Sequence, residues 1–232
     1  MSPEILAGKQ SLTDSETMFH EKHLFAEKFP LPPAAMARME AFVAHLLYWQ
    51  DHKNLIAPST IPHIWHRHIL DSAQLYSLLP QNLTDPSSTA AVIDLGSGAG
   101  FPGLVLAIMG VKNIHLVESQ RAKARFLSEV NDKLSLGCRI YPERIEQLKK
   151  PVCGKLPIGA ITARALAPLD QLLGLCADFA PANSPAFFAK GRSWPDEMAR
   201  AQKLWKIKYQ IHPSITDADS AIIEITEFQL RK

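Results

Sequence analysis

A run of glycines behind a short apolar segment has the spacing of a nucleotide-binding loop. Residues 92–93 are Val and Ile, which predicts a buried strand, and Pro102 suits the first position of a helix. The glycines between them stand at alternating positions, namely Gly96, Gly98 and Gly100. A strand, a tight glycine turn and a helix let a ligand lie against bare backbone, with helix N–H groups directed at it.

Two cofactors fit this loop. Gly98, Gly100 and Gly103 satisfy G-x-G-x-x-G, the fingerprint of dinucleotide-binding proteins. Asp94 also opens a D-x-G-x-G-x-G pattern, which is typical of S-adenosylmethionine-dependent methyltransferases. Glu118 ends the next predicted strand, where a carboxylate can accept both hydroxyls of a ribose in either cofactor. The loop therefore predicts a nucleoside site and leaves the choice of cofactor open.

The elements that position the loop alternate along the chain. We predict strands at 92–94, 114–118, 138–141, 158–162 and 186–189, and helices at 102–109, 121–133, 168–179 and 196–204. Two strand-like segments, 206–211 and 221–226, follow without a helix between them, so they must pair antiparallel. This order predicts an α/β class I methyltransferase fold, Rossmann-like, with a mostly parallel seven-stranded sheet and a C-terminal antiparallel hairpin. The hairpin favours a methyltransferase over a dehydrogenase.

Apolar residues at helical spacing precede this domain. They repeat at i, i+3 and i+4 from Met39 to Leu47 and again from Ile61 to Ile69, which predicts two helices. Residues 1–32 carry little pattern. We expect an N-terminal helical extension over residues 1–80 and a Rossmann-like methyltransferase domain over residues 81–232.

The composition is that of an ordinary globular protein, with 47% hydrophobic and 21% charged residues. No apolar run approaches the length of a membrane span, and the first residues lack a signal pattern, so we expect a cytoplasmic protein without a membrane partner. Cys138, Cys153 and Cys176 are odd in number and form no C-x-x-C, which predicts reduced thiols rather than disulfides or a zinc site. The net charge of +2 does not by itself predict nucleic-acid binding.

The segment that ends the fourth strand limits the kinds of atom that a methyltransferase of this sequence could methylate. Amino-group methyltransferases carry (D/N/S)-P-P-(Y/F) there to bind the target amine, whereas residues 162–167 are T-A-R-A-L-A. Methylation of a pyrimidine carbon needs a thiolate, and no cysteine stands at a suitable strand end. Guanine N7 is nucleophilic at neutral pH and needs chiefly alignment and exclusion of water. The segment therefore indicates a ring-nitrogen target, and we assign no catalytic residue.

An ordered series of motifs resembles the RsmG family, also called GidB. The series spans residues 34–200 and comprises N-L at 54–55, R-H-I-L-D-S at 67–72, D-L-G-S-G-A-G-F-P-G at 94–103, R-I-E at 144–146, A-R-A at 163–165 and A-K-G at 189–191. The resemblance implies a bacterial enzyme that methylates N7 of a guanine in 16S ribosomal RNA. It implies S-adenosyl-L-methionine as the cofactor, and 16S rRNA or a small ribosomal subunit precursor as the partner of a monomer without a metal ion.

The resemblance also implies the residues of the site. Those that would bind the cofactor are Gly96, Gly98, Gly100, Phe101, Glu118, Ser119, Ile145, Glu146 and Arg164. Those that would face the RNA are Arg67, Arg164 and Lys190. The chain departs from the family in the acidic segment 217–219, which argues against an RNA contact by the last hairpin.

Other interpretations remain open at this point. A nicotinamide-dependent oxidoreductase would need a hydride-transfer site and a substrate domain, and the sequence indicates neither. A non-catalytic RNA-binding or ribosome-assembly factor could keep the loop as a relic of a cofactor site. A metal site at His63, His66 and His68 is disfavoured, because their spacing does not place all three on one helix face. We expect His68 to be packed and hydrogen-bonded.

Overall fold

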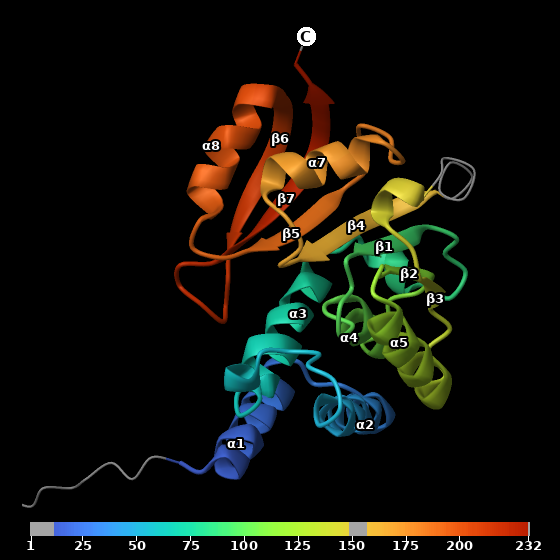
Figure 1. Cartoon of the computed structure of the whole chain (residues 1–232), viewed down its shortest axis with the longest axis vertical. Helices are drawn as coiled ribbons and strands as arrows, with labels where there is room; N and C mark the ends of the chain where they lie inside the picture. The colour runs from blue at the N-terminus through green and yellow to red at the C-terminus, as the bar shows by residue number, and fades with distance from the viewer. Residues whose placement is uncertain (1–11, 149–156, 232) are drawn as a thin grey trace, which may run out of the picture.

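The structure is a computed structural model that describes residues 12–148 and 157–231. Within these residues seven strands form one sheet in the order β3-β2-β1-β4-β5-β7-β6 (Figure 1). The strands are β1 (Ala91–Leu95), β2 (Ile114–Val117), β3 (Arg139–Tyr141), β4 (Ile158–Arg164), β5 (Ala186–Lys190), β6 (Trp205–Pro213) and β7 (Ala221–Leu230). The first five pair in parallel, and β7 runs antiparallel to both β5 and β6. The predicted sheet and its C-terminal hairpin are confirmed.

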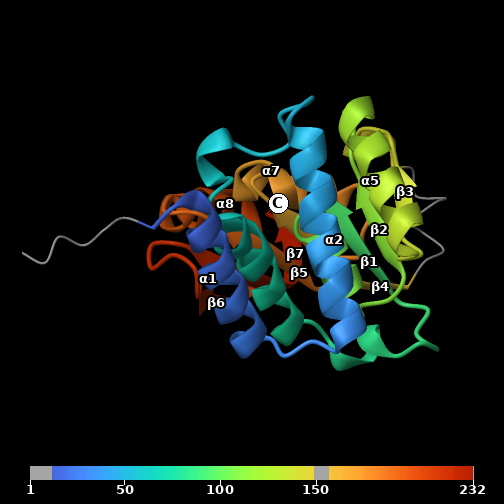
Figure 2. The same ribbon diagram turned by 90° about the horizontal axis from the view of Figure 1, so that it is seen from below.

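Helices cover both faces of the sheet (Figures 1 and 2). They are α1 (Asp14–Lys28), α2 (Pro33–Gln50), the π-helix η2 (Trp65–Leu70), α3 (Asp71–Ala73), α4 (Gly103–Ile108), α5 (Arg121–Leu134), α7 (Leu169–Ala177) and α8 (Trp194–Leu204). Short 3-10 turns are η1 (Pro58–Thr60), η3 (Gln74–Ser77), η4 (Gln81–Thr84) and η5 (Ile145–Gln147). Val92 packs with α4 and α5, whereas its neighbour Ile93 packs with α7 and α8. This alternation explains why the strand is apolar on both faces.

The first helix is a correction to the sequence analysis, which found little pattern before residue 33. α1 begins with a capping box, in which the Glu16 N–H donates to Thr13 Oγ1 at 3.3 Å and the Thr13 N–H donates to Glu16 Oε2 at 2.8 Å. Phe25 is its one fully buried side chain among the described residues and packs on Trp65 at 5.6 Å between ring centroids. A helix that buries so little shows no apolar repeat, although its capping box is visible in the sequence.

The second predicted helix, over residues 61–69, takes an unusual form. It winds as the π-helix η2 before it continues into α3. A π-turn is rare and occurs frequently at functional sites, because it shifts side chains relative to a regular helix. Arg67 and His68 lie in this turn.

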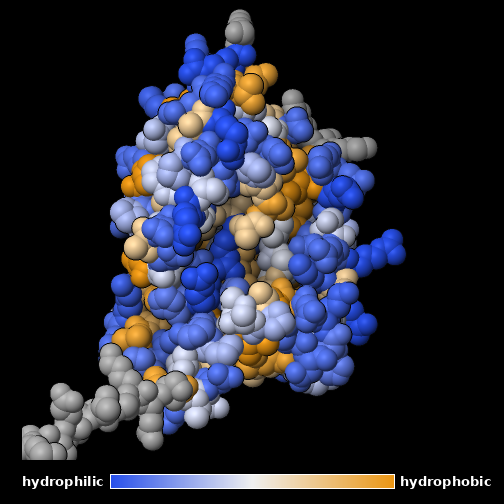
Figure 3. All heavy atoms as spheres, turned by 60° about the vertical axis from the view of Figure 1, so that its left-hand side comes forward, coloured by the Kyte–Doolittle hydropathy of each residue, from blue (hydrophilic) through white to orange (hydrophobic). Residues whose placement is uncertain are grey.

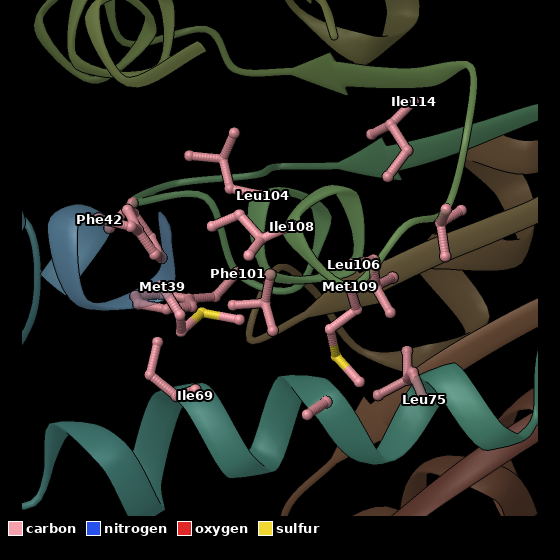
Figure 4. Close-up of a cluster of buried hydrophobic side chains, with 14 of the residues drawn as sticks. Met39, Phe42, Ile69, Leu75, Phe101, Leu104, Leu106, Ile108, Met109 and Ile114 are labelled. Atoms are coloured by element: carbon pink, nitrogen blue, oxygen red, sulfur yellow. The ribbon is translucent and has the colours of Figure 1, made fainter. Parts of the chain in front are cut away.

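The helices at the N-terminal end share one core with the sheet (Figure 4). Met39 and Phe42 of α2 pack with Ile69 of η2 and with Leu104 of α4. Phe42 also lies 5.5 Å from Phe101 between ring centroids, so this core supports the end of the glycine loop.

The outer surface seen in Figure 3 is mainly hydrophilic, with hydrophobic side chains in small groups. Over the described ranges, 12–148 and 157–231, none of the helices combines the length and the apolar character that crossing a membrane requires.

Candidate cofactor and substrate site

The glycine loop adopts a backbone that favours glycine. Gly96, Gly98 and Gly100 have φ angles of +63°, +57° and +90°, in the left-handed region where other residues are strained. A side chain at Gly98 would point into open space, because the nearest atom to its Cβ position is the Gly96 carbonyl oxygen at 3.8 Å. The loop therefore leaves bare backbone exposed for a ligand.

Asp94 fixes the base of the loop. Its buried carboxylate accepts hydrogen bonds from Thr162 Oγ1 of β4 at 2.8 Å and from the Gly103 N–H of α4 at 3.3 Å. Burial raises the pKa of Asp94 to about 6, despite these hydrogen bonds. This residue joins β1, β4 and α4 and does not line the cavities described next.

A cavity of about 540 Å³, here called the nucleoside cavity, opens at the carboxyl end of β1. Its volume is within the range of small-molecule sites. It is lined by eight of the nine residues predicted to bind the cofactor, namely Gly96, Gly98, Phe101, Glu118, Ser119, Ile145, Glu146 and Arg164. Gly100 does not line the cavity; its Cβ position faces the Leu104 side chain at 2.4 Å, so glycine is required there for packing.

Glu118 connects the glycine loop to the end of β2. Its Oε2 accepts the Gly98 N–H at 2.9 Å and its Oε1 accepts the Gln120 N–H at 2.7 Å. The carboxylate is held by two backbone donors at the edge of the nucleoside cavity. This position suits the recognition of neighbouring hydroxyl groups on a sugar.

A second cavity of about 550 Å³, here called the substrate cavity, adjoins the first. The two share a wall made of His68, Arg164, Ala165, Leu166 and Ala167. The substrate cavity is bounded further by η2, the end of β5 and the turn between β6 and β7. Two ligands could therefore meet across one wall.

Arg164 is the most connected residue of this wall. Its Nη1 donates to Asp71 Oδ2 at 2.8 Å and to the Arg67 carbonyl oxygen at 2.9 Å. Its Nη2 donates to His68 Nδ1 at 2.6 Å, and its guanidinium lies 5.1 Å from the centre of the Phe101 ring. These contacts hold the guanidinium in one orientation between the cavities.

The protonation of His68 follows from its partners. Because a guanidinium can only donate, His68 Nδ1 must accept from Arg164, and the neutral ring carries its proton on Nε2. Nε2 lies 2.8 Å from Thr60 Oγ1, whose own proton goes to the Ala57 carbonyl oxygen at 2.7 Å. Burial, together with the charges of Arg164 and Arg67, lowers the pKa of His68 to about 3. His68 is thus packed and hydrogen-bonded, as the sequence predicts.

The segment after β4 turns sharply at the wall. Ala165 has a φ of +52°, which is unusual for a residue with a side chain and is typical of strained functional sites. The next residue, Leu166, is 36% exposed and covers Gly96, whose Cβ position lies 2.5 Å from Leu166 Cδ1. Leu166, Asp71 and His68 are not among the predicted site residues, because their places in the site depend on contacts between distant segments.

The two remaining basic residues of the predicted site differ from each other. Lys190 lines the substrate cavity, but its side chain is only 8% exposed and its ammonium group pairs with Glu197 at 2.8 Å. Burial alone would raise the pKa of Glu197, and the hydrogen bonds from Lys190 and Ser193 lower it below its usual range. Arg67 is half-exposed and pairs with Asp217 at 3.7 Å. Both side chains are paired, but the Arg67 pair is longer and exposed and so remains accessible to a charged ligand, whereas the Lys190 pair is buried.

The described cysteines are buried and poorly suited to act as nucleophiles. Burial raises the pKa of both Cys138 and Cys176 to about 12. Cys153 lies outside the described residues. His63 pairs with Glu21 at 2.8 Å, and no group of three or more His, Cys, Asp or Glu side chains within residues 12–148 and 157–231 could hold a metal ion.

The fold and the two cavities define a class I methyltransferase. The chain belongs to the family described as rRNA small subunit methyltransferase G (GidB), whose model matches residues 35–225. It is 41% identical to the ribosomal RNA small subunit methyltransferase G of Rhodospirillum centenum over 207 residues, covering 89% of this chain and 91% of that protein. It is 40% identical to the protein of the same name from Rhodospirillum rubrum over 203 residues, covering 88% and 96%.

A solved structure shares the fold at low sequence identity. The Methanococcus jannaschii fibrillarin pre-rRNA processing protein matches with a TM-score of 0.51 and 12% identity, covering 68% of this chain and 75% of that chain. Family membership confirms the predicted class, an rRNA small subunit methyltransferase with S-adenosylmethionine as its cofactor. Neither the oxidoreductase nor the non-catalytic interpretation is favoured.

Proposed function

We propose that the protein transfers a methyl group from S-adenosylmethionine to N7 of a guanine in 16S rRNA, acting as a monomer in the cytoplasm. The observation that carries this proposal is the single wall between the nucleoside cavity and the substrate cavity. A target base in the second cavity would lie directly beside the methyl donor in the first. The proposed binding residues are those that the family resemblance implies.

The nucleoside cavity has features that fit the cofactor. Gly98 leaves room at the backbone, and Glu118 places its carboxylate where a ribose would lie. Ile145 and Glu146 line the side on which an adenine would be held, and Arg164 borders the end nearest the substrate cavity. When bound, S-adenosylmethionine supplies an electrophilic methyl group on a positively charged sulfur.

The side chains of the wall suit a reaction that needs no general base. Guanine N7 carries no proton, so none has to be removed as the new bond forms. His68 is neutral and has both ring nitrogens engaged, and Arg164 can only donate. Leu166 presents an apolar side chain between the cavities, which would exclude water from the reacting atoms. The chain contributes alignment and exclusion of water, which is what this reaction requires.

Mapping the modified nucleotide tests the proposal. Purified protein is incubated with methyl-labelled cofactor and either free 16S rRNA or small subunits from cells that lack this activity. Nuclease digestion and mass spectrometry should then find the label in 7-methylguanosine at one position. Label on another base atom would overturn the N7 assignment. Absence of label on both substrates, with cofactor binding shown by calorimetry, would overturn the proposed substrate.

A further inference from the structure

The turn between β6 and β7, residues 214–220, lies at the mouth of the substrate cavity. Its first half is anchored to the helical segment opposite. The Ile215 N–H donates to Gln74 Oε1 at 3.0 Å, and Thr216 Oγ1 donates to Asp71 Oδ1 at 2.8 Å. The second half of the turn carries the acidic residues Asp217 and Asp219.

Each of these aspartates meets an arginine from a different part of the chain. Asp217 Oδ2 lies 3.7 Å from Arg67 Nη1 of η2, and Asp219 Oδ2 lies 3.2 Å from Arg192 Nε, which follows β5. The side chains of Arg67 and Arg192 are 50% and 86% exposed. Exposed pairs with a single contact contribute little stability and exchange readily with other ions.

We infer that Arg67 and Arg192 form a binding site for RNA phosphates. In the free protein the carboxylates of Asp217 and Asp219 occupy this site, and the phosphates displace them when RNA binds. This inference rests on the proposed rRNA substrate. A phosphodiester presents two oxygens to a guanidinium much as a carboxylate does, so it can replace the aspartate without a change in the arginine. Arg67 lines the cavity in which the target base would lie, and Arg192 directly follows Gly191, which also lines it, so the phosphates are those close to the target nucleotide.

Two buried ion pairs that line the substrate cavity show why the exposed pairs are the ones that would exchange. The side chains of Arg164 and Asp71 are 16% and 19% exposed, and those of Lys190 and Glu197 are 8% and 12% exposed. Both pairs are reinforced by further hydrogen bonds, to the Arg67 carbonyl oxygen and to Ala167 respectively. Partners as buried as these would be left without compensation if a ligand displaced one of them.

The turn itself keeps its acidic groups charged. The Asp219 N–H donates to Asp217 Oδ1 at 3.0 Å, and this hydrogen bond is the main reason that the pKa of Asp217 is lowered. A charged turn competes with every RNA that approaches the arginines. An RNA whose shape also fills the cavity gains contacts that offset this competition, so the turn favours the correct target over unspecific RNA.

Neutralising the two aspartates and removing the two arginines should shift RNA affinity in opposite directions. The probes are single-stranded polyuridine and 16S rRNA, with binding measured by fluorescence anisotropy at several salt concentrations. The double variant D217N/D219N should bind polyuridine about three to ten times more tightly, because two competing charges are lost. The double variant R67A/R192A should bind more weakly, and its slope of log affinity against log salt should fall in magnitude by about 1.4, or 0.7 for each lost phosphate contact.

A matched control lies on the strands of the same hairpin, where Lys208 of β6 is paired with Glu227 of β7. Lys208 and Glu227 form an equally exposed pair at 2.7 Å that does not border the cavity. The variants K208A and E227Q should leave both the affinity and the salt slope unchanged.

The inference fails if D217N/D219N binds polyuridine no more tightly than the wild type, or if the control variants shift affinity as much as D217N/D219N and R67A/R192A do. Methyl transfer to 16S rRNA is measured in parallel on the wild type. Transfer without the predicted affinity shifts would overturn this inference alone, whereas absence of transfer would overturn the proposed function.

Discussion

The nucleoside cavity and the substrate cavity are nearly equal in volume but are built in different ways. Apart from the wall that the two cavities share, the nucleoside cavity is lined mainly by the loop at residues 96–101 and by the residues that follow β2 and β3. Its most specific contact is from the Gly98 backbone to Glu118. The substrate cavity instead collects side chains from the second helix, the ends of β4 and β5, and the turn of the last hairpin.

Because of this difference, the two cavities should respond to different kinds of substitution. A cavity shaped by backbone is damaged mainly by added side chains, because it depends on space. A cavity held by ion pairs between distant segments is damaged by removing one partner, because the other is left unpaired. Substitutions should therefore be able to destroy cofactor binding with little change elsewhere, whereas substrate-cavity substitutions should affect turnover and stability together.

The largest effect is expected from Gly98→Val. The new side chain would occupy the space at the open backbone, and a φ of +57° is strained for valine. Cofactor affinity measured by calorimetry should fall at least about a hundredfold, which corresponds to about 3 kcal/mol or more. The control is Gly137→Val, which has a φ of +72° and open space around it but lies between α5 and β3. It should lose similar stability and keep its cofactor affinity; equal loss of affinity in both would mean that strain, and not the ligand's space, is responsible.

The glycine loop and Glu118 can be found from the sequence pattern because they are local, whereas Ile145, Glu146 and Arg164 follow only from the family resemblance. The glycine spacing, the strand before it and Glu118 are all visible within about 25 residues of chain, a typical length for such a binding unit. The order of strands follows as well, because alternation of strand and helix allows few arrangements. Only Gly100 among the predicted cofactor residues lies away from the cavity, since a packing glycine and a ligand-facing glycine look the same in a sequence.

The substrate cavity could not be predicted to the same extent. Arg67, Arg164 and Lys190 line it, but the partners of the two arginines are far along the chain. Asp71 contacts Arg164 across 93 residues and Thr216 across 145. No local pattern encodes such pairs. The same holds for Leu166, whose place follows from the left-handed backbone at Ala165.

Arg164→Ala should reduce cofactor affinity less than Gly98→Val does. It should instead act mainly on turnover and stability. Methyl transfer should fall about a hundredfold, because the wall between the cavities loses the group that orients it. Loss of the guanidinium leaves the Asp71 carboxylate, 19% exposed, without its main partner, at a cost of about 2 kcal/mol. Single-turnover kinetics and urea unfolding measure the two effects.

Two further variants sharpen this prediction. Arg125 also lies over an aromatic ring, Trp49 at 6.0 Å, and pairs with Glu129 at 2.9 Å, but it is 76% exposed. Arg125→Ala should cost under about 0.5 kcal/mol and leave turnover intact. The double variant R164A/D71A should lose less stability than the sum of the losses measured for R164A and D71A alone. Full additivity would show that the two side chains do not stabilise each other.

Near neutral pH a small effect on stability is expected from His68→Asn, and it should grow as the pH falls. The pKa of His68 is about 3 in the folded protein and about 6.5 in the unfolded chain, so the unfolded chain binds more protons below pH 6.5. Stability therefore falls as pH decreases from 6.5, and His68 accounts for up to about 2 kcal/mol of that loss at pH 5. Asparagine does not titrate, and its amide oxygen can still accept from Arg164, so the variant should lose less stability than the wild type between pH 7 and pH 5. Asp94 acts in the opposite sense, since its raised pKa of about 6 costs stability as pH rises, but it is present in both proteins and cancels from the difference. Parallel curves of unfolding free energy against pH would show that the ring takes up a proton in the folded protein as readily as in the unfolded chain.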